Sequence, residues 1–284
     1  MMKRIAFVIP YFGPFPAWMD YFIASCRKNE SVDFFIFSDN EKPAGWPENI
    51  HYYTIDFQGY KNIVSDKLGI NFDPDNAYKL CDIKPALGIV HEEVLQQYDF
   101  WGFCDIDVVF GNLRAFLTED FLEKFDFFSA HERRVAGHLS LMKNEKKYNE
   151  SFMIAKDWRD VFEDQSHRSF DEKHYSDIYK GFKNFPRPLA KIISWVMLPL
   201  SRKALFREEF STPELRYNWV DGSRNFPSEW YWENGRLTNN QSEREFLYLH
   251  FLKWKRDWGG SDISHVPSNE INNKWKITVN GFEE

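Results

Sequence analysis

The chain has 284 residues and a formal net charge of -7 at pH 7, from 36 basic and 43 acidic side chains. This length allows one large α/β domain with an ample core. The acidic balance argues against nucleic acid as the main partner, because a phosphate backbone is met by a basic surface. The three cysteines, Cys26, Cys81 and Cys104, are widely spaced and include no C-x-x-C pair. This usage indicates neither a disulfide framework nor a zinc site, and it predicts a reducing, cytoplasmic environment.

Strand and helix signals alternate through the first half of the chain, which is typical of a mostly parallel sheet with helices on both faces. Apolar runs predict strands at residues 4–9, 33–37, 51–55 and 100–104. Helical spacing predicts helices at residues 16–28, 60–68 and 78–98, the last broken or kinked at Pro85. The next segments are predicted as a helix at 113–124 and extended chain at 125–130 and 139–143.

No linker rich in Gly, Pro or Ser divides the chain, and the sequence contains no internal repeat. We therefore expect one continuous fold with an N-terminal half at residues 1–130 and a C-terminal half at residues 131–284. Pro10 ends the first apolar run too early for a signal peptide, so this run is predicted to be the first strand.

Residues 180–207 interrupt the acidic character of the chain. This segment has seven basic side chains and no acidic one, around the apolar run 189–200. The run is too short to cross a bilayer, which needs about 20 residues. Two interpretations stay open: a buried helix, or an amphipathic element that lies in a membrane interface with Trp195 at the boundary.

Asp105 and Asp107 directly follow the apolar run 100–104. Side chains alternate along an extended strand, so the two carboxylates should project the same way while Ile106 turns into the core. Such a pair can hold Mg²⁺ or Mn²⁺, which take one or two protein carboxylates together with water and diphosphate oxygens. The alternative is a pair of solvated strand-end carboxylates. A second Asp-x-Asp, at residues 73–75, has a proline at its centre and no strand before it, which indicates a turn.

Ligands of open α/β sheets lie beyond the carboxyl ends of the strands. Pro10, Tyr11 and Phe12 end the first predicted strand, where an aromatic ring could stack on a base. Asp39 follows the second strand, where a carboxylate could bond a base or ribose. A plain turn is the alternative for Asp39.

Lys79, Asp82 and Lys84 lie close together at a predicted helix start. Lys79 and Asp82 share one helix face, which makes them either donor-binding groups or a local ion pair. Near the C-terminus, His250 follows an apolar run and precedes Lys253. An imidazole there could be a third metal ligand and the ammonium could neutralise a phosphate, although a lone histidine is more often a core residue.

The order of these motifs resembles that of GT-A glycosyltransferases, most of all the bacterial enzymes that assemble surface polysaccharides such as O-antigen and capsule. The motifs are Ile-Pro-Tyr-Phe, Phe-Ser-Asp-Asn, Tyr-Lys-Leu-Cys-Asp-Ile-Lys-Pro-Ala, Phe-Cys-Asp-Ile-Asp-Val-Val-Phe-Gly and His-Phe-Leu-Lys-Trp-Lys. The resemblance implies a Rossmann-type, mostly parallel sheet flanked by helices. Its nucleotide-sugar-binding half would be residues 1–130, and residues 131–284 would form the acceptor side.

The resemblance implies transfer of a hexose from a nucleotide sugar, a UDP-sugar of the UDP-galactose type, to a glycan or polyprenyl-linked glycan. Mn²⁺ or Mg²⁺ would be bound by Asp105, Asp107 and, as in glycogenin-like transferases, His250. Lys253 would lie near the phosphates, although the glycine that usually separates such a His from its Lys is absent here.

Two further implications concern the sugar pocket and the location. Gly137 and His138 resemble the loop and strand that line the pocket, where a glycine allows close backbone approach. A membrane-bound acceptor would fit an enzyme on the inner face of the cell membrane that makes peripheral contact through residues 184–207.

An inverting enzyme would also need a carboxylate near the acceptor hydroxyl, and the candidates are Asp221, Glu229 and Glu233 in the Trp-rich stretch 219–232 and just after it. Each could instead be a surface charge, and a retaining enzyme need not place a base there. Two other functions compete. Asp105 and Asp107 also fit a haloacid-dehalogenase-like phosphatase, and a non-catalytic sugar-binding module would keep the aromatic residues without needing a metal.

Overall fold

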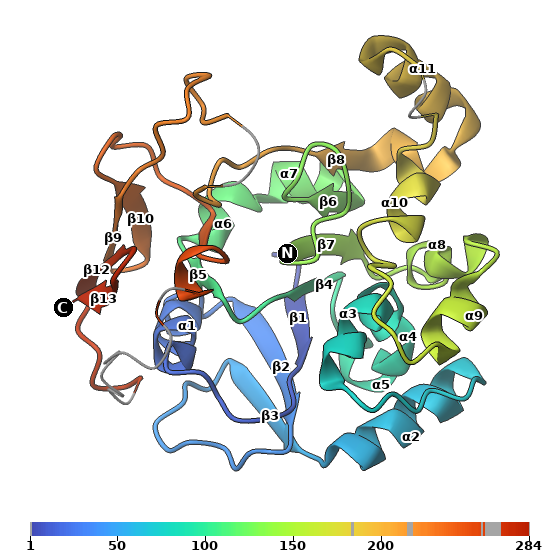
Figure 1. Cartoon of the computed structure of the whole chain (residues 1–284), viewed down its shortest axis with the longest axis horizontal. Helices are drawn as coiled ribbons and strands as arrows, with labels where there is room; N and C mark the ends of the chain where they lie inside the picture. The colour runs from blue at the N-terminus through green and yellow to red at the C-terminus, as the bar shows by residue number, and fades with distance from the viewer. Residues whose placement is uncertain (1, 183–184, 215–217, 257, 259–267, 284) are drawn as a thin grey trace.

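The computed structural model describes residues 2–182, 185–214, 218–256, 258 and 268–283. Its centre is a seven-stranded sheet in which every neighbouring pair is parallel except the two that involve β7. In spatial order the strands are β3 (Ile50–Thr54), β2 (Val32–Ser38), β1 (Ile5–Pro10), β4 (Phe100–Cys104), β7 (Leu139–Lys143), β6 (Phe127–Ser129) and β8 (Ala204–Phe206). The predicted α/β fold with a mostly parallel sheet flanked by helices is therefore confirmed (Figure 1).

Strand β1 lies inside the sheet between β2 and β4, and its side chains are buried on both faces. Phe7 belongs to the apolar cluster on one face, whereas Ala6 and Val8 belong to the cluster on the other. A strand covered on both faces reads as a continuous apolar run, which is why residues 5–9 are apolar without alternation.

Helices cover both faces of the sheet (Figure 1). One face packs against α1 (Met19–Arg27), α6 (Leu113–Phe116) and α7 (Glu119–Lys124). The other is covered by α2 (Phe57–Leu68), α3 (Leu80–Ile83), α4 (Leu87–Val90), α5 (Glu92–Leu95), α8 (Lys146–Asn149), α9 (Trp158–Glu163) and α10 (His174–Tyr179).

Two predicted helices are broken into shorter pieces. Residues 78–98 form α3, α4 and α5 together with the short 3₁₀ turns η1 (Ala77–Lys79) and η2 (Lys84–Ala86), and Pro85 stands at the start of η2. Residues 113–124 divide into α6 and α7 because the Thr118 side chain accepts a hydrogen bond from the Phe121 N–H and begins a new helix.

The C-terminal part of the chain forms strands that the sequence patterns did not predict. An antiparallel sheet contains β10 (Arg236–Asn239), β9 (Glu229–Glu233), β12 (Lys274–Thr278) and β13 (Gly281–Glu283). Its inner face carries tryptophans: Trp232 stacks on Trp275 at 4.7 Å between ring centroids and donates a hydrogen bond to the Phe110 carbonyl. This contact fixes the small sheet against β5 (Val108–Phe110), which pairs with β11 (Tyr248–His250).

Helix α11 (Arg187–Met197) lies at the edge of the molecule, beyond the 3₁₀ turn η4 (Pro199–Lys203) that leads into β8 (Figure 1). Ile192, Trp195 and Met197 are each more than half exposed. The buried-helix interpretation of this run is therefore wrong. Among the described residues, no helix combines the length and the apolar character needed to cross a membrane.

Replacing Gly102 by alanine should destabilise the fold. A Cβ at this position in β4 would lie 2.3 Å from the Ser140 carbonyl oxygen of β7 and 2.8 Å from the ring of Phe7. Overpacking of this kind costs about 1–3 kcal/mol, so the urea midpoint of Gly102→Ala should fall clearly. Gly181→Ala is the control, because its Cβ would meet the flexible end of Leu198 at 3.3 Å and the Asp177 carbonyl oxygen at 3.6 Å, which is an ordinary contact distance. Equal midpoints for the two variants would contradict the packing described here.

Candidate metal site at the end of strand β4

Two distant segments build the site at the carboxyl end of β4. Asp105 and Asp107 lie in the turn between β4 and β5, and Ile106 between them is buried in the apolar core, as the alternation predicted. Strand β11 pairs with β5 so that His250 lies opposite Val108. The Phe251 N–H donates to the Asp107 carbonyl at 3.2 Å, and the pairing thus places the imidazole beside both carboxylates.

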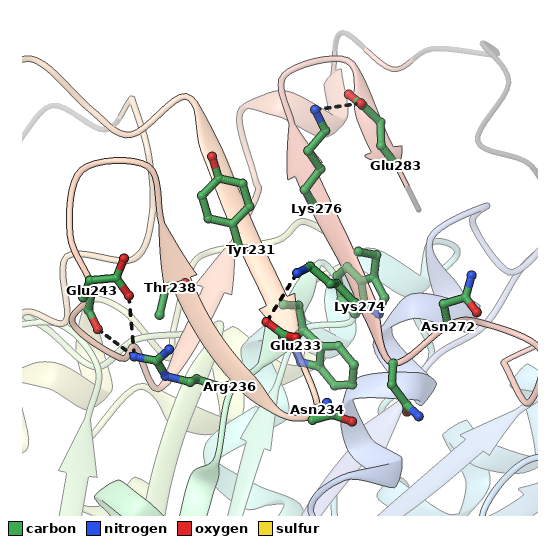
Figure 2. A pocket seen from close by; sticks show the side chains of 13 residues that line it. Tyr231, Glu233, Asn234, Arg236, Thr238, Glu243, Asn272, Lys274, Lys276 and Glu283 are labelled. Atoms are coloured by element: carbon green, nitrogen blue, oxygen red, sulfur yellow. Dashed lines mark hydrogen bonds and ion pairs between the residues drawn. The ribbon is translucent and has the colours of Figure 1, made fainter.

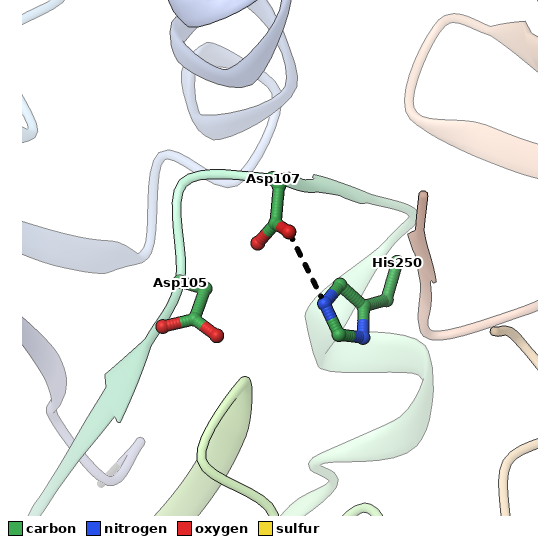
Figure 3. A group of neighbouring side chains, drawn as sticks. All are labelled: Asp105, Asp107 and His250. Carbon is green, nitrogen blue, oxygen red and sulfur yellow. Dashed lines mark ion pairs between the residues drawn. The ribbon is translucent and has the colours of Figure 1, made fainter. Parts of the chain in front are cut away.

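One donor atom from each of Asp105, Asp107 and His250 can be chosen so that all three lie within 4.8 Å of one another (Figure 3). His250 Nε2 and Asp107 Oδ2 are both buried and lie 3.3 Å apart, and Asp107 Oδ2 is also ion-paired with Lys255. Two carboxylates and one imidazole suit Mn²⁺ or Mg²⁺ better than a soft metal that prefers thiolate ligands. Two carboxylates and a buried imidazole nitrogen within 4.8 Å of one another form a donor set that a divalent cation accepts, so the residues fit the predicted ion.

Each carboxylate also faces an ammonium group. The buried Lys84 donates to Asp105 and, at 2.9 Å, to the Gly137 carbonyl. Burial alone would lower the pKa of Lys84, but Asp105 and the neighbouring Cys81 and Asp171 raise it well above its ordinary value. Lys84 therefore stays charged, which fixes the Asp105 carboxylate at the mouth of the site.

Asp107 lies 2.6 Å from Lys255 Nζ. Burial would raise the pKa of the Asp107 carboxyl, but His250 and Lys255 hold it well below its usual range. Asp107 is thus ionised at any physiological pH, as a metal ligand must be. The sequence patterns did not single out Lys255.

The His138 ring packs against the ring of His250. The two rings stack with centroids 4.2 Å apart, and His138 Nε2 is hydrogen-bonded to the Tyr248 hydroxyl at 2.7 Å. The other nitrogen of His250, Nδ1, lies 3.4 Å from the Thr212 hydroxyl. Burial holds the pKa of His138 well below its ordinary value, so this ring stays neutral against its neighbour. Partners of this kind fix the orientation of a ligating histidine.

Asp171 is a buried carboxyl that the sequence analysis missed. A Cβ on Gly137 would come within 2.5 Å of Asp171 Oδ2 and 3.8 Å of Lys84 Nζ, so the glycine lets this carboxyl approach the site. Asp171 Oδ1 has no hydrogen-bond partner among the described residues. Burial raises the pKa of Asp171 to about 7, although Lys84 opposes the shift. A single Asp in an acid-rich loop gives no sequence signal of this environment.

The residues after β1 and β2 form a connected loop at the same edge of the sheet. Tyr11, which follows Pro10, is half-buried and donates from its hydroxyl to the Pro14 carbonyl at 2.8 Å. Asp39 accepts the Gly13 N–H at 3.0 Å. Both aromatic rings are half-buried: Phe12 packs against Phe57 and Tyr60, and Tyr11 stacks on Phe15.

Lys79 and Asp82 form a fully buried ion pair at 3.0 Å, which is the local alternative that the sequence analysis left open. Lys79 also donates to the carbonyls of Val161 and Ser166. Asp82 accepts the backbone N–H groups of Arg168 and Phe170. The pair holds the loop that carries Asp171, and neither side chain has an exposed surface for a donor.

The three carboxylates predicted as base candidates lie on the C-terminal part of the chain. Asp221 accepts the Ser223 N–H in an exposed turn, and Glu229 accepts the Tyr231 hydroxyl at 2.6 Å. Glu233 faces Lys274 at 3.7 Å. On β9, the odd-numbered residues face away from the buried Trp230 and Trp232, so both glutamates point outward.

The outward face of this sheet lines an open hollow of about 920 Å³, in which Glu233 and Lys274 point toward each other (Figure 2). None of the contacts of Asp221, Glu229 or Glu233 described here reaches Asp105, Asp107 or His250. Lys253 is half-buried, and its contact with phosphates stays a prediction.

The sequence matches one known protein family over nearly its whole length. Residues 7–284 match a family of unknown function (DUF6625). The chain belongs to this family. No curated protein matches it in sequence.

Three solved structures similar to this chain are glycosyltransferases by their descriptions. The galactosyltransferase LgtC, in complex with donor and acceptor sugar analogues, is 10% identical with a TM-score of 0.36, over 73% of this chain and 74% of its own. Mouse xyloside xylosyltransferase 1 is 9% identical with a TM-score of 0.44, over 88% and 97%. A glycosyltransferase involved in the glycosylation of the major capsid of PBCV-1 is 8% identical with a TM-score of 0.38, over 88% of this chain and 93% of its own. At this level of similarity, function has to be inferred from the side chains of the site.

The Lys79–Asp82 ion pair should make the free energy of unfolding depend on pH in the acidic range. Burial opposes ionisation of Asp82, but hydrogen bonds from His167 and two backbone N–H groups lower its pKa from 3.8 to about 2. A carboxyl whose pKa is lower in the folded than in the unfolded chain stabilises the fold at pH values above its unfolded pKa. This stabilisation, about 2 kcal/mol, is lost as the pH falls from about 4 toward 2.

Urea unfolding at pH 7, 4 and 2.5 would measure this loss. Asp82→Asn should be less stable at pH 7, because Lys79 is left buried without its partner, and should lose less stability on acidification. The exposed Asp75→Asn is the control and should behave as the wild type. The same acid slope for Asp82→Asn and the wild type would contradict this assignment.

Proposed function

We propose that this protein is a metal-dependent glycosyltransferase that moves a sugar from a nucleotide sugar to a glycan acceptor. The observation that carries the proposal is the convergence of Asp105, Asp107 and His250 within 4.8 Å at the carboxyl end of β4. In an open α/β sheet this edge is where nucleotides bind. A hard cation held there by oxygen and imidazole ligands is suited to a diphosphate.

The chain's own residues would act on the leaving group. When bound, the cation would supply positive charge to the departing diphosphate, whose negative charge grows as the anomeric bond breaks. Lys255 adds a second positive charge on the same side, 2.6 Å from Asp107. Lys84 keeps Asp105 in place, and His138 keeps His250 in place. These contacts preorganise the site before the donor arrives.

Asp171 is the carboxyl we assign to the sugar. It lies beside Lys84 and Gly137, and its unpartnered Oδ1 could accept a hydrogen bond from a sugar hydroxyl. The general base remains a proposal, with Asp221, Glu229 and Glu233 as its candidates. We rank this proposal below the assignment of Asp171, because the contacts of these three carboxylates are with local surface groups.

The finer assignments rest on the resemblance of the sequence motifs to GT-A enzymes. We propose a UDP-hexose of the UDP-galactose type as donor, Mn²⁺ as the ion, and a bacterial surface polysaccharide or polyprenyl-linked glycan as acceptor. Catalysis at the cytoplasmic face of the membrane would give access to a lipid-linked acceptor. Residues 1–130 would bind the donor and residues 131–284 would complete the acceptor side.

The phosphatase alternative is not favoured. A haloacid-dehalogenase-like enzyme takes its Mg²⁺ with oxygen ligands, whereas the third member of this cluster is an imidazole aligned by β11. A non-catalytic sugar-binding module would not need two neighbouring carboxylates that each form an ion pair with a lysine.

Thermal unfolding with UDP and Mn²⁺ tests the proposal. A ligand at 100 times its Kd stabilises the folded state by about 2.7 kcal/mol, so UDP with Mn²⁺ should raise the Tm of the wild type above the value with either alone. Asp107→Asn and the more exposed Asp105→Asn should abolish the metal-dependent part and the turnover of UDP-sugars. Asp75→Asn, in the other Asp-x-Asp, is the matched control. No shift in the wild type with any nucleotide and Mn²⁺ would refute the proposal.

Substitution of the two lysines after His250 separates their roles. If Lys255 is the ammonium that meets the diphosphate, Lys255→Met should weaken Mn²⁺-dependent UDP binding about ten-fold or more, since a charge-assisted hydrogen bond contributes about 1.5–3 kcal/mol. Lys255→Arg should retain most of the affinity. Lys253→Met should have the smaller effect in calorimetry, and the reverse order would instead support the prediction for Lys253.

A further inference from the structure

Helix α11 and the short segment before it carry a dense group of exposed apolar side chains. Seven large apolar residues between positions 182 and 197 are at least 36% exposed: Phe182, Phe185, Leu189, Ile192, Trp195, Val196 and Met197. They make up nearly half of the exposed large apolar residues found among the described residues. An exposed apolar group of this density marks an interaction surface.

The helix is amphipathic in the reverse sense to an ordinary surface helix. Leu189, Ile192 and Val196 follow the i, i+3, i+7 spacing of one helix face and are exposed. On the opposite side, Ser194 is buried and donates from its hydroxyl to the Gly181 carbonyl at 3.2 Å. The helix thus turns a small polar residue toward the protein and its large apolar side chains toward the surroundings.

Basic side chains border this apolar face. Lys191 is exposed one turn before Trp195. Arg202 of η4 lies over the Trp195 ring at 5.7 Å and donates to the Trp195 and Val196 carbonyls at the end of the helix. No acidic residue occurs between positions 180 and 207, although the whole chain has a net charge of -7. The positive charge is therefore concentrated where the apolar residues are exposed.

We propose that the face formed by α11 and η4 docks on an anionic lipid surface. The apolar residues would enter the acyl boundary, Trp195 would lie at the headgroup level, and the lysine and arginine side chains would meet lipid phosphates. A second copy of the chain is the less suitable occupant, because a two-fold contact would bring the same basic residues together. This inference goes beyond sugar transfer and does not depend on the metal site.

Vesicle flotation tests this docking. Vesicles of phosphatidylcholine should bind the full chain weakly, and vesicles that also contain phosphatidylglycerol should bind it strongly and in a salt-sensitive way. Ile192→Ser combined with Trp195→Ser should reduce the bound fraction about ten-fold or more, since it removes the inserting side chains. Lys191→Glu should cause a loss of similar size on the anionic vesicles only, because it reverses one charge at the lipid surface.

Matched controls replace similar residues elsewhere. Ile154→Ser removes an apolar side chain that is 60% exposed, and Lys146→Glu reverses a lysine that is 84% exposed. Both should bind vesicles as the wild type does. The Mn²⁺-dependent Tm shift with UDP should be the same in all these variants, so loss of docking and loss of donor binding are separate results.

Three outcomes would overturn the inference. The first is a wild type that fails to bind anionic vesicles. The second is vesicle binding that the Ile192, Trp195 and Lys191 substitutions leave unchanged. The third is sedimentation of the wild type as a dimer that the Ile192 and Trp195 substitutions dissociate while vesicles bind neither form.

Discussion

The pairing of β5 with β11 is the constraint on which the candidate site depends. These two short strands join residue 108 to residue 250, so that an imidazole from the C-terminal part of the chain meets the carboxylates that leave β4. The tryptophan-rich sheet behind β5 makes this pairing rigid, because Trp232 bonds the Phe110 carbonyl and stacks on Trp275. The C-terminal sheet therefore acts on the site through the backbone of β5.

Charge compensation is the second organising feature. Two carboxylates this close would repel each other, and each is instead matched by a lysine: Lys84 for Asp105 and Lys255 for Asp107. Asp171 is buried nearby without such a direct partner, and its pKa is raised to about 7 by that burial. The same region thus contains Asp107, which stays ionised, and Asp171, which titrates near neutral pH. Contrasting environments of this kind are characteristic of functional sites.

The molecule separates its two candidate interaction sites in space. The candidate metal site lies at the carboxyl end of β4, whereas α11 lies at the edge of the molecule (Figure 1) and has exposed apolar side chains in a segment without acidic residues. A nucleotide sugar and a lipid surface could be engaged by different parts of one chain. Transfer to a lipid-linked acceptor would require both, which links the proposed function to the proposed docking face without making either depend on the other.

The sequence by itself determined the α/β class, the strands β1 to β4 and the pair Asp105 and Asp107, because apolar runs and strand alternation are local properties of the chain. It did not distinguish a functional Lys79–Asp82 from a structural pair, nor a buried helix at 189–200 from an exposed one. Burial decided both, and burial is a property of the folded chain. Asp171 approaches Gly137, 34 residues away in the sequence, and Lys255 pairs with Asp107, 148 residues away. Only tertiary structure brings such segments together, since no local pattern encodes which distant side chain will lie beside a given carboxylate.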